Sequence, residues 1–278
     1  AVLGVSSYRT TLDVWLEIME AREPGFCEKN GYRFEKFEGN AATKWGHAFE
    51  SAVIELAETA TGYKIRNREK LYTADNLEYI TCHIDGQYAH DELHEGKTTS
   101  AHYFYSNFGE PGSDRVPLEY QVQCQHELIC TGAEKVILSV LVFPKRVEEW
   151  EAEGVEIILE PDGEYLILTK NISEHPIRWA QVLYDMGYFH QYTIHPDAEL
   201  QQMMLEKYSL FWNENILGGK MPDVANTSDI KKIYTEPKGT VIATEQVERW
   251  NAERKQLMSE KKDIDKRIEQ LKTLEQNY

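Results

Sequence analysis

The chain has 278 residues, enough for one large domain or a domain with an appendage, and it contains no apolar run long enough to span a membrane and no segment resembling a signal peptide. Its formal net charge of −17 disfavours a protein that binds nucleic acid over its whole surface, although a local basic surface or bound cations could still hold DNA. The four cysteines form no CxxC pair, which favours buried reduced thiols over a zinc site or an iron–sulfur cluster.

The first predicted helix covers residues 6–19, where apolar residues recur at helical spacing after a Ser/Thr-rich start. Residues 24–43 have no strong period and are predicted to form a loop or lid. A second helix is predicted to begin near Ala41 and to end at Gly62. Glu50 lies within its apolar stripe, so the carboxylate must reach solvent or a cationic partner. The residues of the two helices predicted to face the core are Leu12, Trp15, Leu16, Met19, Phe49, Val53, Ile54, Leu56 and Ala57.

Three strands are predicted over residues 63–68, 77–83 and 93–98, with turn signals between them. The one dense basic run extends from Lys64 to Lys70, and its charges alternate as on one face of a strand. This face is either solvated or in contact with a DNA backbone.

Acidic residues near two of these strands indicate a metal site. Asp85 follows the second strand, and a hairpin connection would return Glu95 beside it. Two carboxylates, completed by water and phosphate oxygens, suit Mg²⁺. Lys97 points to the same side of its strand as Glu95, where it can orient or deprotonate a water that attacks a phosphodiester. The alternative is two solvated strand ends with ordinary surface charges, because the pattern is short.

A further helix is predicted to begin at Pro117, after an aromatic and glycine-rich loop over residues 102–114. Tyr120, Gln123 and Glu127 share one face of this helix. A glutamine on that face can hydrogen-bond a nucleophilic water or a phosphate oxygen without adding charge beside a cation. An ordinary surface glutamine is the alternative.

The second half of the chain begins with a nearly continuous apolar run over residues 134–142, which predicts a fully buried central strand. The elements predicted after it are strands over 155–159 and 165–168, a helix over 177–188, a strand over 192–194 and a helix over 197–218. In the last helix, the residues predicted to face inward are Leu200, Met203, Met204, Tyr208, Phe211 and Trp212.

The C-terminal part changes character. We divide the chain into a main domain over residues 1–220, a polar linker over 221–244 and a helical tail over 245–278. Apolar residues of the tail fall on a seven-residue repeat, but Arg254 and Lys261 interrupt the seam. This broken heptad favours an amphipathic helix that docks on its own body or on a neighbour, with a strict coiled coil as the alternative.

Four motifs occur in order between Trp45 and Gly132: WGxxxE, DG, ExK followed by Thr-Thr-Ser, and YxxQxQ with a later Thr-Gly. Together they resemble the phage lambda exonuclease group, also called YqaJ-type viral recombinases. Four ordered motifs at compatible spacing are more specific than any one of them. The resemblance implies an α/β fold with a restriction-endonuclease-like core, in which helices flank a central mixed sheet, and we expect residues 145–188 to be an insertion relative to shorter members.

The resemblance also implies an enzyme, a Mg²⁺-dependent exonuclease that digests double-stranded DNA from 5′ to 3′ and leaves single strand for recombination. Mn²⁺ would be a substitute cofactor. Asp85 and Glu95 would be the metal ligands, with the backbone carbonyl of Gly96 as a third. Lys97 and Gln123 would act on the attacking water.

Three further residues take roles only from the resemblance. Glu50 matches the acidic residue that closes the metal site, while Tyr120 and Gln125 match helix positions assigned to DNA binding. Family members usually carry a larger residue at the position of Gly96, so a contact with the core is expected to be unfilled here. The family holds the 5′-phosphate of DNA on an Arg and a Gly-Ser-Asp-type segment, which we expect to precede Ala1.

The implied partners are double-stranded DNA ends, a single-strand annealing protein and further copies of the chain in a trimeric ring, with no membrane. The implied location is the cytoplasm of a bacterial host, with a phage or prophage origin. Two other classes stay open: another restriction-endonuclease-like repair nuclease, and a catalytically inert DNA-binding or assembly module. The intact set of Asp85, Glu95 and Lys97 argues against the inert module.

Overall fold

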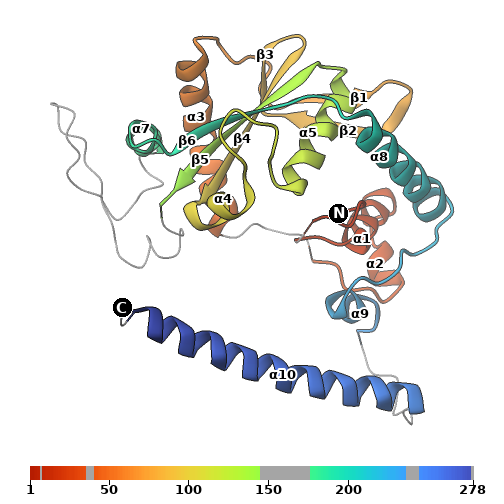
Figure 1. Ribbon diagram of the computed structural model, residues 1–278. Coiled ribbons are helices and arrows are strands. Elements are labelled where there is room, and N and C mark those ends of the chain that lie inside the picture. Colours follow the sequence, from red (N-terminus) through yellow and green to blue (C-terminus); the bar gives the residue numbers. More distant parts are fainter. Residues whose placement is uncertain (7, 36–40, 145–175, 236–243, 277–278) are drawn as a thin grey trace. The chain divides into compact units, whose positions relative to one another are not determined.

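The computed structural model describes residues 1–6, 8–35, 41–144, 176–235 and 244–276 (Figure 1). The chain divides into two compact units, Ala1–Ile233 and Tyr234–Tyr278. The strands predicted over residues 155–159 and 165–168, and most of the predicted insertion, lie outside the described residues. Among the helices that are described, none combines the length and the apolar character needed to cross a membrane.

A four-stranded mixed sheet lies at the centre of the first unit (Figure 1). Its strands, in spatial order, are β3 (Gly86–Ala89), β4 (Glu92–Ser100), β5 (Lys135–Phe143) and β6 (Phe189–Ile194). β4 and β5 are parallel, whereas the β3–β4 and β5–β6 pairs are antiparallel. A separate antiparallel hairpin is formed by β1 (Lys70–Ala74) and β2 (Leu77–Ile84). The predicted α/β core with a central mixed sheet is therefore confirmed.

The first helix, α1 (Thr11–Arg22), begins where its sequence provides a cap. The Thr10 hydroxyl accepts a hydrogen bond from the Asp13 N–H, and the Asp13 carboxylate accepts one from the Thr10 N–H. This capping box satisfies two backbone donors that a helix start otherwise leaves unpaired. The predicted inward residues Leu12, Trp15 and Leu16 are buried. The first helix was predicted over residues 6–19 and thus begins five residues later than predicted.

The two helices that flank the motifs begin where predicted, and the first of them also ends where predicted. α3 (Ala41–Thr61) is followed by Gly62, which has a left-handed φ of 74°. α5 (Leu118–Thr131) starts directly after Pro117 and ends at Gly132, with a φ of 68°. Glycine is favoured at such helix ends because it adopts the left-handed conformation without a Cβ penalty.

Strand β5 is buried on both faces, as its apolar sequence predicts. Leu138 packs in one hydrophobic cluster with residues of α5, such as Leu128. Leu141 packs in another cluster with residues of α3 and of α7 (Pro176–Asp185). Helices therefore cover both faces of the strand, which explains why polar and apolar residues do not alternate along it.

The strand predicted over residues 63–68 is not formed. The segment contributes one isolated bridge, between Arg66 and Gln87, and the backbone at Asn67 and Glu69 has positive φ of 53° and 52°. Left-handed residues interrupt an extended strand, so β1 starts only after them.

The basic run consequently lacks the alternating face expected of it. Lys64 and Arg68 both turn toward Glu58 of α3, with nitrogen–oxygen distances of 2.5 Å and 3.7 Å. These two cations are engaged by the protein itself, which leaves less of the run for a DNA backbone.

Two segments predicted as loops contain short helices. α2 (Phe26–Lys29) lies within residues 24–43, and α4 (Ala101–Asn107) occupies the start of the loop predicted over 102–114. Ser100 caps α4 through its hydroxyl. Both helices are too short for apolar periodicity to distinguish them from loops.

The end of the first unit follows the predicted order, with one change of helix type. The helix predicted over residues 197–218 consists of α8 (Ala198–Leu210) and a π-helix, η2 (Phe211–Leu217). Met204 is fully buried as predicted, but Met203 is 52% exposed, against prediction. Adjacent helical residues point about 100° apart, so only one of the two can face the core.

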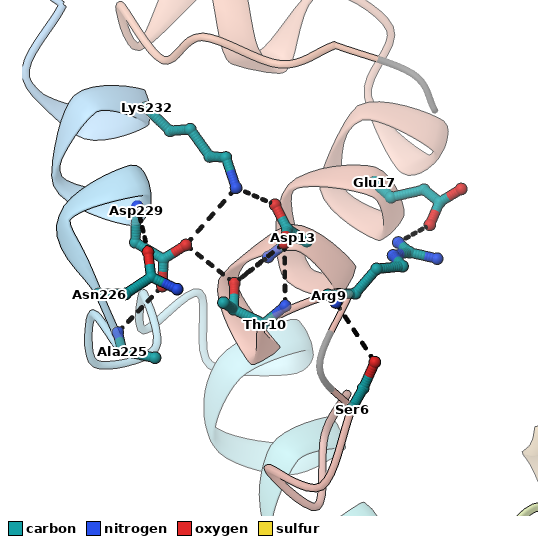
Figure 2. Close-up of polar contacts among 9 residues, drawn as sticks. All are labelled: Ser6, Arg9, Thr10, Asp13, Glu17, Ala225, Asn226, Asp229 and Lys232. Atoms are coloured by element: carbon teal, nitrogen blue, oxygen red, sulfur yellow. Dashed lines mark hydrogen bonds and ion pairs between the residues drawn. The ribbon is translucent and has the colours of Figure 1, made fainter. Parts of the chain in front are cut away.

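The segment predicted as a linker over residues 221–244 contains a further helix, α9 (Thr227–Ile233), that belongs to the first unit. Asp229 is fully buried, and it accepts hydrogen bonds of 2.9 Å from the Thr10 hydroxyl and from the Ala225 N–H (Figure 2). Lys232 lies 3.5 Å from Asp229 and forms an ion pair with Asp13. We call this set, Thr10, Asp13, Asp229 and Lys232, the α1–α9 latch.

The second unit contains the predicted C-terminal helix, α10 (Glu245–Gln276). Its apolar side chains are exposed, at Val247, Trp250, Leu257, Met258, Ile264, Ile268, Leu271 and Leu274. The tail thus forms one long helix, and its amphipathic docking on a partner stays a prediction.

Candidate active site

Asp85 lies in the tight connection between β2 and β3. The following residue, Gly86, allows the chain to pass close to Ile65, since a Cβ on that glycine would stand 2.2 Å from the Ile65 Cγ2. The Asp85 Oδ2 accepts a 2.8 Å hydrogen bond from the Gly96 N–H. The structure therefore brings Asp85 against the middle of the Glu95-x-Lys97 segment of β4.

Glu95 and Lys97 lie on the same side of β4 and form an ion pair. Gln123 of α5 reaches the same carboxylate, because its Nε2 donates to the Glu95 Oε1 at 2.5 Å. The same nitrogen lies 3.2 Å from the Glu127 Oε1. We call Asp85, Glu95, Lys97, Gln123 and Glu127 the Lys97 cluster.

The Lys97 cluster is deeply buried and carries an excess of negative charge. Glu95 is 2% exposed and Glu127 is 1% exposed. Burial, together with repulsion from Glu95, raises the pKa of Asp85 to about 7. The same two causes raise the pKa of Glu127 well above its usual range. Burial alone would lower the pKa of Lys97, but the neighbouring Glu95 carboxylate outweighs this effect and the pKa is raised.

A divalent cation fits this charge pattern. The Glu95 Oε2 and the Glu127 Oε2 are buried and find no hydrogen-bond partner among the described residues. Unpaired carboxylate oxygens are hard donors of the kind Mg²⁺ and Mn²⁺ bind. In the part of the chain that the structure describes, no three Asp, Glu, His or Cys side chains stand together as a ready ligand set. Asp85 and Glu95 would hold such an ion with water and substrate oxygens completing its shell.

Glu50 and Tyr120 border the cluster. Glu50 of α3 lies 3.7 Å from the His47 Nδ1, and its charge contributes to the raised pKa of Asp85. The ring centroid of Tyr120 lies 5.7 Å from the Lys97 Nζ, within the range of a cation–π contact. Both residues therefore lie beside the cluster, and their roles stay predictions.

Gln125 is placed elsewhere, which corrects its predicted role in DNA binding. Its side chain is fully buried and donates to the His195 carbonyl at 2.7 Å. Its Oε1 accepts hydrogen bonds from the Asp197 N–H at 3.0 Å and from Gln201 at 2.8 Å. Gln125 thus connects α5 to the start of α8, and no surface is left for a DNA contact.

The contact expected to be unfilled at Gly96 is in fact closed. A Cβ at this position would lie 3.1 Å from the Val53 Cγ1 of α3 and 3.5 Å from the Asp85 Oδ2. Helix α3 packs directly on the glycine, so the missing side chain leaves no gap.

Glu127 is a residue of the cluster to which the sequence analysis assigned no role. Its position one turn after Gln123, on the face shared with Tyr120, was the available signal. Sequence alone does not tell a buried glutamate from one at the helix surface, and glutamate is mostly found at surfaces.

A cavity of about 600 Å³ adjoins the cluster. Lys97, Tyr120 and Gln123 line it from the side of the cluster, and aliphatic and aromatic residues line most of the rest. The aromatic lining residues are Tyr8, Tyr79, Tyr120, Tyr208, Phe211 and Trp212. The cavity gives a substrate access to the otherwise buried ammonium and amide groups.

The fold and the buried acidic cluster define a mixed α/β protein with a candidate metal-dependent active site. Residues 1–134 match the family described as the YqaJ-like viral recombinase domain, which confirms the resemblance seen in the four motifs.

One curated relative and several solved structures are similar to the chain. The relative is the uncharacterized protein YqaJ of Bacillus subtilis strain 168, which is 23% identical over 242 residues. The match covers 84% of this chain but only 58% of the relative's length.

The solved structures are similar at low identity. The phage-related exonuclease of Haemophilus somnus 129PT is 14% identical over 75% of this chain and 83% of that one, with a TM-score of 0.46. The alkaline exonuclease LHK-Exo of Laribacter hongkongensis is 13% identical over 75% of this chain and 91% of that one, with a TM-score of 0.35. In complex with dAMP, LHK-Exo matches 80% of this chain and 90% of its own at 14% identity, with a TM-score of 0.37.

Proposed function

We propose that this protein is a Mg²⁺-dependent exonuclease that digests double-stranded DNA from 5′ to 3′ and leaves single strand for recombination. The observation that carries the proposal is the buried Lys97 cluster, in which Asp85, Glu95, Lys97 and Gln123 converge beside an open cavity. The family match over residues 1–134 supports a role in viral recombination. Two of the similar solved proteins are named exonucleases, and we propose the same activity for this chain.

The chemistry assigned to the cluster is hydrolysis of a phosphodiester. When bound, Mg²⁺ polarises the phosphate and lowers the pKa of a coordinated water, with Mn²⁺ as a substitute. Asp85 and Glu95 would hold the ion, with the Gly96 carbonyl as a third ligand. Lys97 and Gln123 would orient the attacking water. The Gln123 carbonyl oxygen would accept a hydrogen bond from it, the Lys97 ammonium would stabilise the hydroxide that forms, and the proton that the water loses would pass to solvent. Glu50 adds a carboxylate at the edge of the site.

The proposed substrate is a DNA end. A chain with a net charge of −17 attracts DNA weakly over its surface, so enclosure by a ring of copies holds the substrate better than electrostatic attraction. We propose a trimeric ring formed by the first unit, a single-strand annealing protein as partner, and the cytoplasm of a bacterial host as location.

A digestion assay tests the activity and its polarity together. Linear duplexes labelled at the 5′ or the 3′ end are incubated with the protein, with and without Mg²⁺. We expect early release of label from the 5′ end as mononucleotides, only when Mg²⁺ or Mn²⁺ is present. Early release from the 3′ end would reverse the proposed polarity, and intact duplex under all conditions would refute the nuclease.

A further inference from the structure

The side chain of Glu127 lies one helical turn after Gln123 on α5, and it is almost completely buried. Its Oε1 accepts a 3.2 Å hydrogen bond from the Gln123 Nε2, while the same nitrogen donates to the Glu95 Oε1 at 2.5 Å. The amide nitrogen of Gln123 is therefore held between two carboxylates.

This arrangement decides which way the amide of Gln123 points. A glutamine amide has a donor end and an acceptor end that differ by a rotation of 180°. The Glu95 carboxylate, which also binds Lys97, is one acceptor for the NH₂ group, and Glu127 supplies a second. Two acceptors on one side fix the NH₂ group there, so the Gln123 carbonyl oxygen is turned toward the other side of the amide, and Gln123 lines the cavity.

Burying Glu127 costs free energy that a hydrogen-bonded pair with a purely structural role does not need to spend. Its Oε2 is buried without a hydrogen-bond partner among the described residues, and an unpaired buried carboxylate oxygen is unfavourable. The protein also contains a surface version of the same contact, in which the Gln202 Nε2 donates to the Glu206 Oε1 at 2.8 Å across one turn of α8. The surface pair provides the same local hydrogen bond without burial.

We infer that Glu127 is a positioning residue, which orients the amide of Gln123 so that its carbonyl oxygen accepts a hydrogen bond from the attacking water. The inference rests on the proposed nuclease function and assigns a role to a group outside the predicted site. In this role Glu127 acts through Gln123.

The test compares steady-state cleavage of a linear duplex in Mg²⁺ for the wild type, Glu127→Met, Glu127→Gln, Gln123→Ala and the double variant of Gln123→Ala with Glu127→Met. Methionine preserves most of the volume but cannot accept the hydrogen bond. We expect kcat to fall about 10-fold in Glu127→Met, the size typical of a lost outer-shell contact, with KM within about twofold of wild type. Glutamine retains a carbonyl acceptor, so Glu127→Gln should recover most of the loss.

Coupling to Gln123 separates positioning from a structural role. The double variant should be no slower than Gln123→Ala alone, because without the amide there is nothing left to orient. Glu206→Met is the matched control and should cleave like the wild type. Thermal unfolding of each variant is measured first, and Glu127→Leu replaces Glu127→Met if the latter does not fold.

Three results would overturn the inference. They are an unchanged kcat in Glu127→Met, losses that multiply in the double variant, and an equal loss in Glu127→Gln and Glu127→Met, which would assign the effect to charge. The wild type is assayed in parallel, so a failure of the proposed function is distinguishable: an inactive wild type refutes the nuclease, whereas an active wild type with an indifferent Glu127 refutes only the positioning role.

Discussion

The α1–α9 latch and the Lys97 cluster both bury carboxylates in the first unit, but they pair them to different extents. In the latch, the fully buried Asp229 accepts hydrogen bonds from a hydroxyl and a backbone N–H and lies near Lys232 (Figure 2). In the cluster, Lys97 is the ammonium that faces Asp85, Glu95 and Glu127, and two carboxylate oxygens lack a partner among the described residues. A paired carboxylate stabilises its surroundings, whereas an unpaired one strains them unless a ligand binds. The latch thus has the features of a structural site, and the cluster those of a binding site.

The largest effect on activity is expected when a carboxylate is removed from the Lys97 cluster. We expect Asp85→Ala and Glu95→Ala each to reduce Mg²⁺-dependent cleavage by about 10³-fold or more, since several kcal/mol of metal assistance is lost. The melting temperature of Asp85→Ala should not fall, because the change relieves repulsion between buried acids. Glu95→Ala should melt lower, because it also removes the ion-pair partner of Lys97. Calorimetry with Mn²⁺ checks the cause, and unchanged metal binding in both variants would contradict the ligand assignment.

Removing the cation of the cluster should have the next largest effect. Lys97→Ala is expected to slow cleavage by about 10²-fold or more, with little change in DNA affinity, because the ammonium acts on the attacking water. Single-turnover rates and a separate binding titration distinguish the two quantities. A cleavage rate close to that of the wild type would show that Lys97 only forms a buried ion pair and does not act on the attacking water.

Removing a carboxylate from the α1–α9 latch should lower the stability of the fold without changing the rate of cleavage. Asp229→Ala removes the acceptor of two hydrogen bonds and leaves Lys232 less well paired, so we expect a loss of about 2–4 kcal/mol in the free energy of unfolding. Urea unfolding measures this loss, with the exposed Asp223→Ala as control. A loss of cleavage at temperatures where Asp229→Ala is fully folded would show that the latch also serves the active site.

Acidification should weaken the latch through Asp13. Burial opposes ionisation of Asp13, but hydrogen bonds from Lys232 and Thr10 outweigh it and lower the pKa of the carboxyl below its ordinary value of 3.8. Because the pKa of Asp13 is lower in the folded than in the unfolded state, its ionisation stabilises the fold fully above the unfolded pKa. This stabilisation is lost as the pH falls from the unfolded pKa through the folded pKa. Melting curves of the wild type and Asp13→Asn should therefore converge below about pH 4. A difference in melting temperature between the two proteins that persists or widens in acid would contradict this prediction.

The smallest effect is expected outside both sites. Truncation after Pro237 removes α10 and should preserve the oligomer mass and the nuclease activity, if the first unit forms the ring. Light scattering on the full and truncated chains measures the mass. A monomer in both cases would refute the ring, and an oligomer lost only on truncation would place the interface in the tail.

Most of the fold could be predicted because its elements are specified locally. α3 and α5 end in glycines at left-handed positions, and β5 is apolar on both faces. The failure at residues 63–68 has a local cause that propensity does not reveal, namely the left-handed backbone of Asn67 and Glu69. Asparagine adopts that conformation several times more readily than most residues, but glutamate does not.

The residues of the candidate site could be predicted where the spacing along a strand or helix determines the side to which each side chain points. Glu95 and Lys97 are two residues apart on a strand and share a side, as expected. On α5, Gln123 and Gln125 are also two apart, but helical geometry separates them by about 200°, so only one can face β4. The sequence motif names both glutamines, and the helical period distinguishes the site residue from the buried structural one.

The contact between Gly96 and Val53 makes the middle position of the Glu-x-Lys motif a spacer between two layers of the protein. A relative with a bulky residue at this position must either hold α3 farther from β4 or shorten the side chain opposite it. Glu50 lies one turn before Val53, so its carboxylate moves with the helix and its distance from Asp85 changes as well. Positions 53 and 96 should therefore vary together in volume across relatives, and the pair should set how strongly Glu50 acts on the candidate metal site.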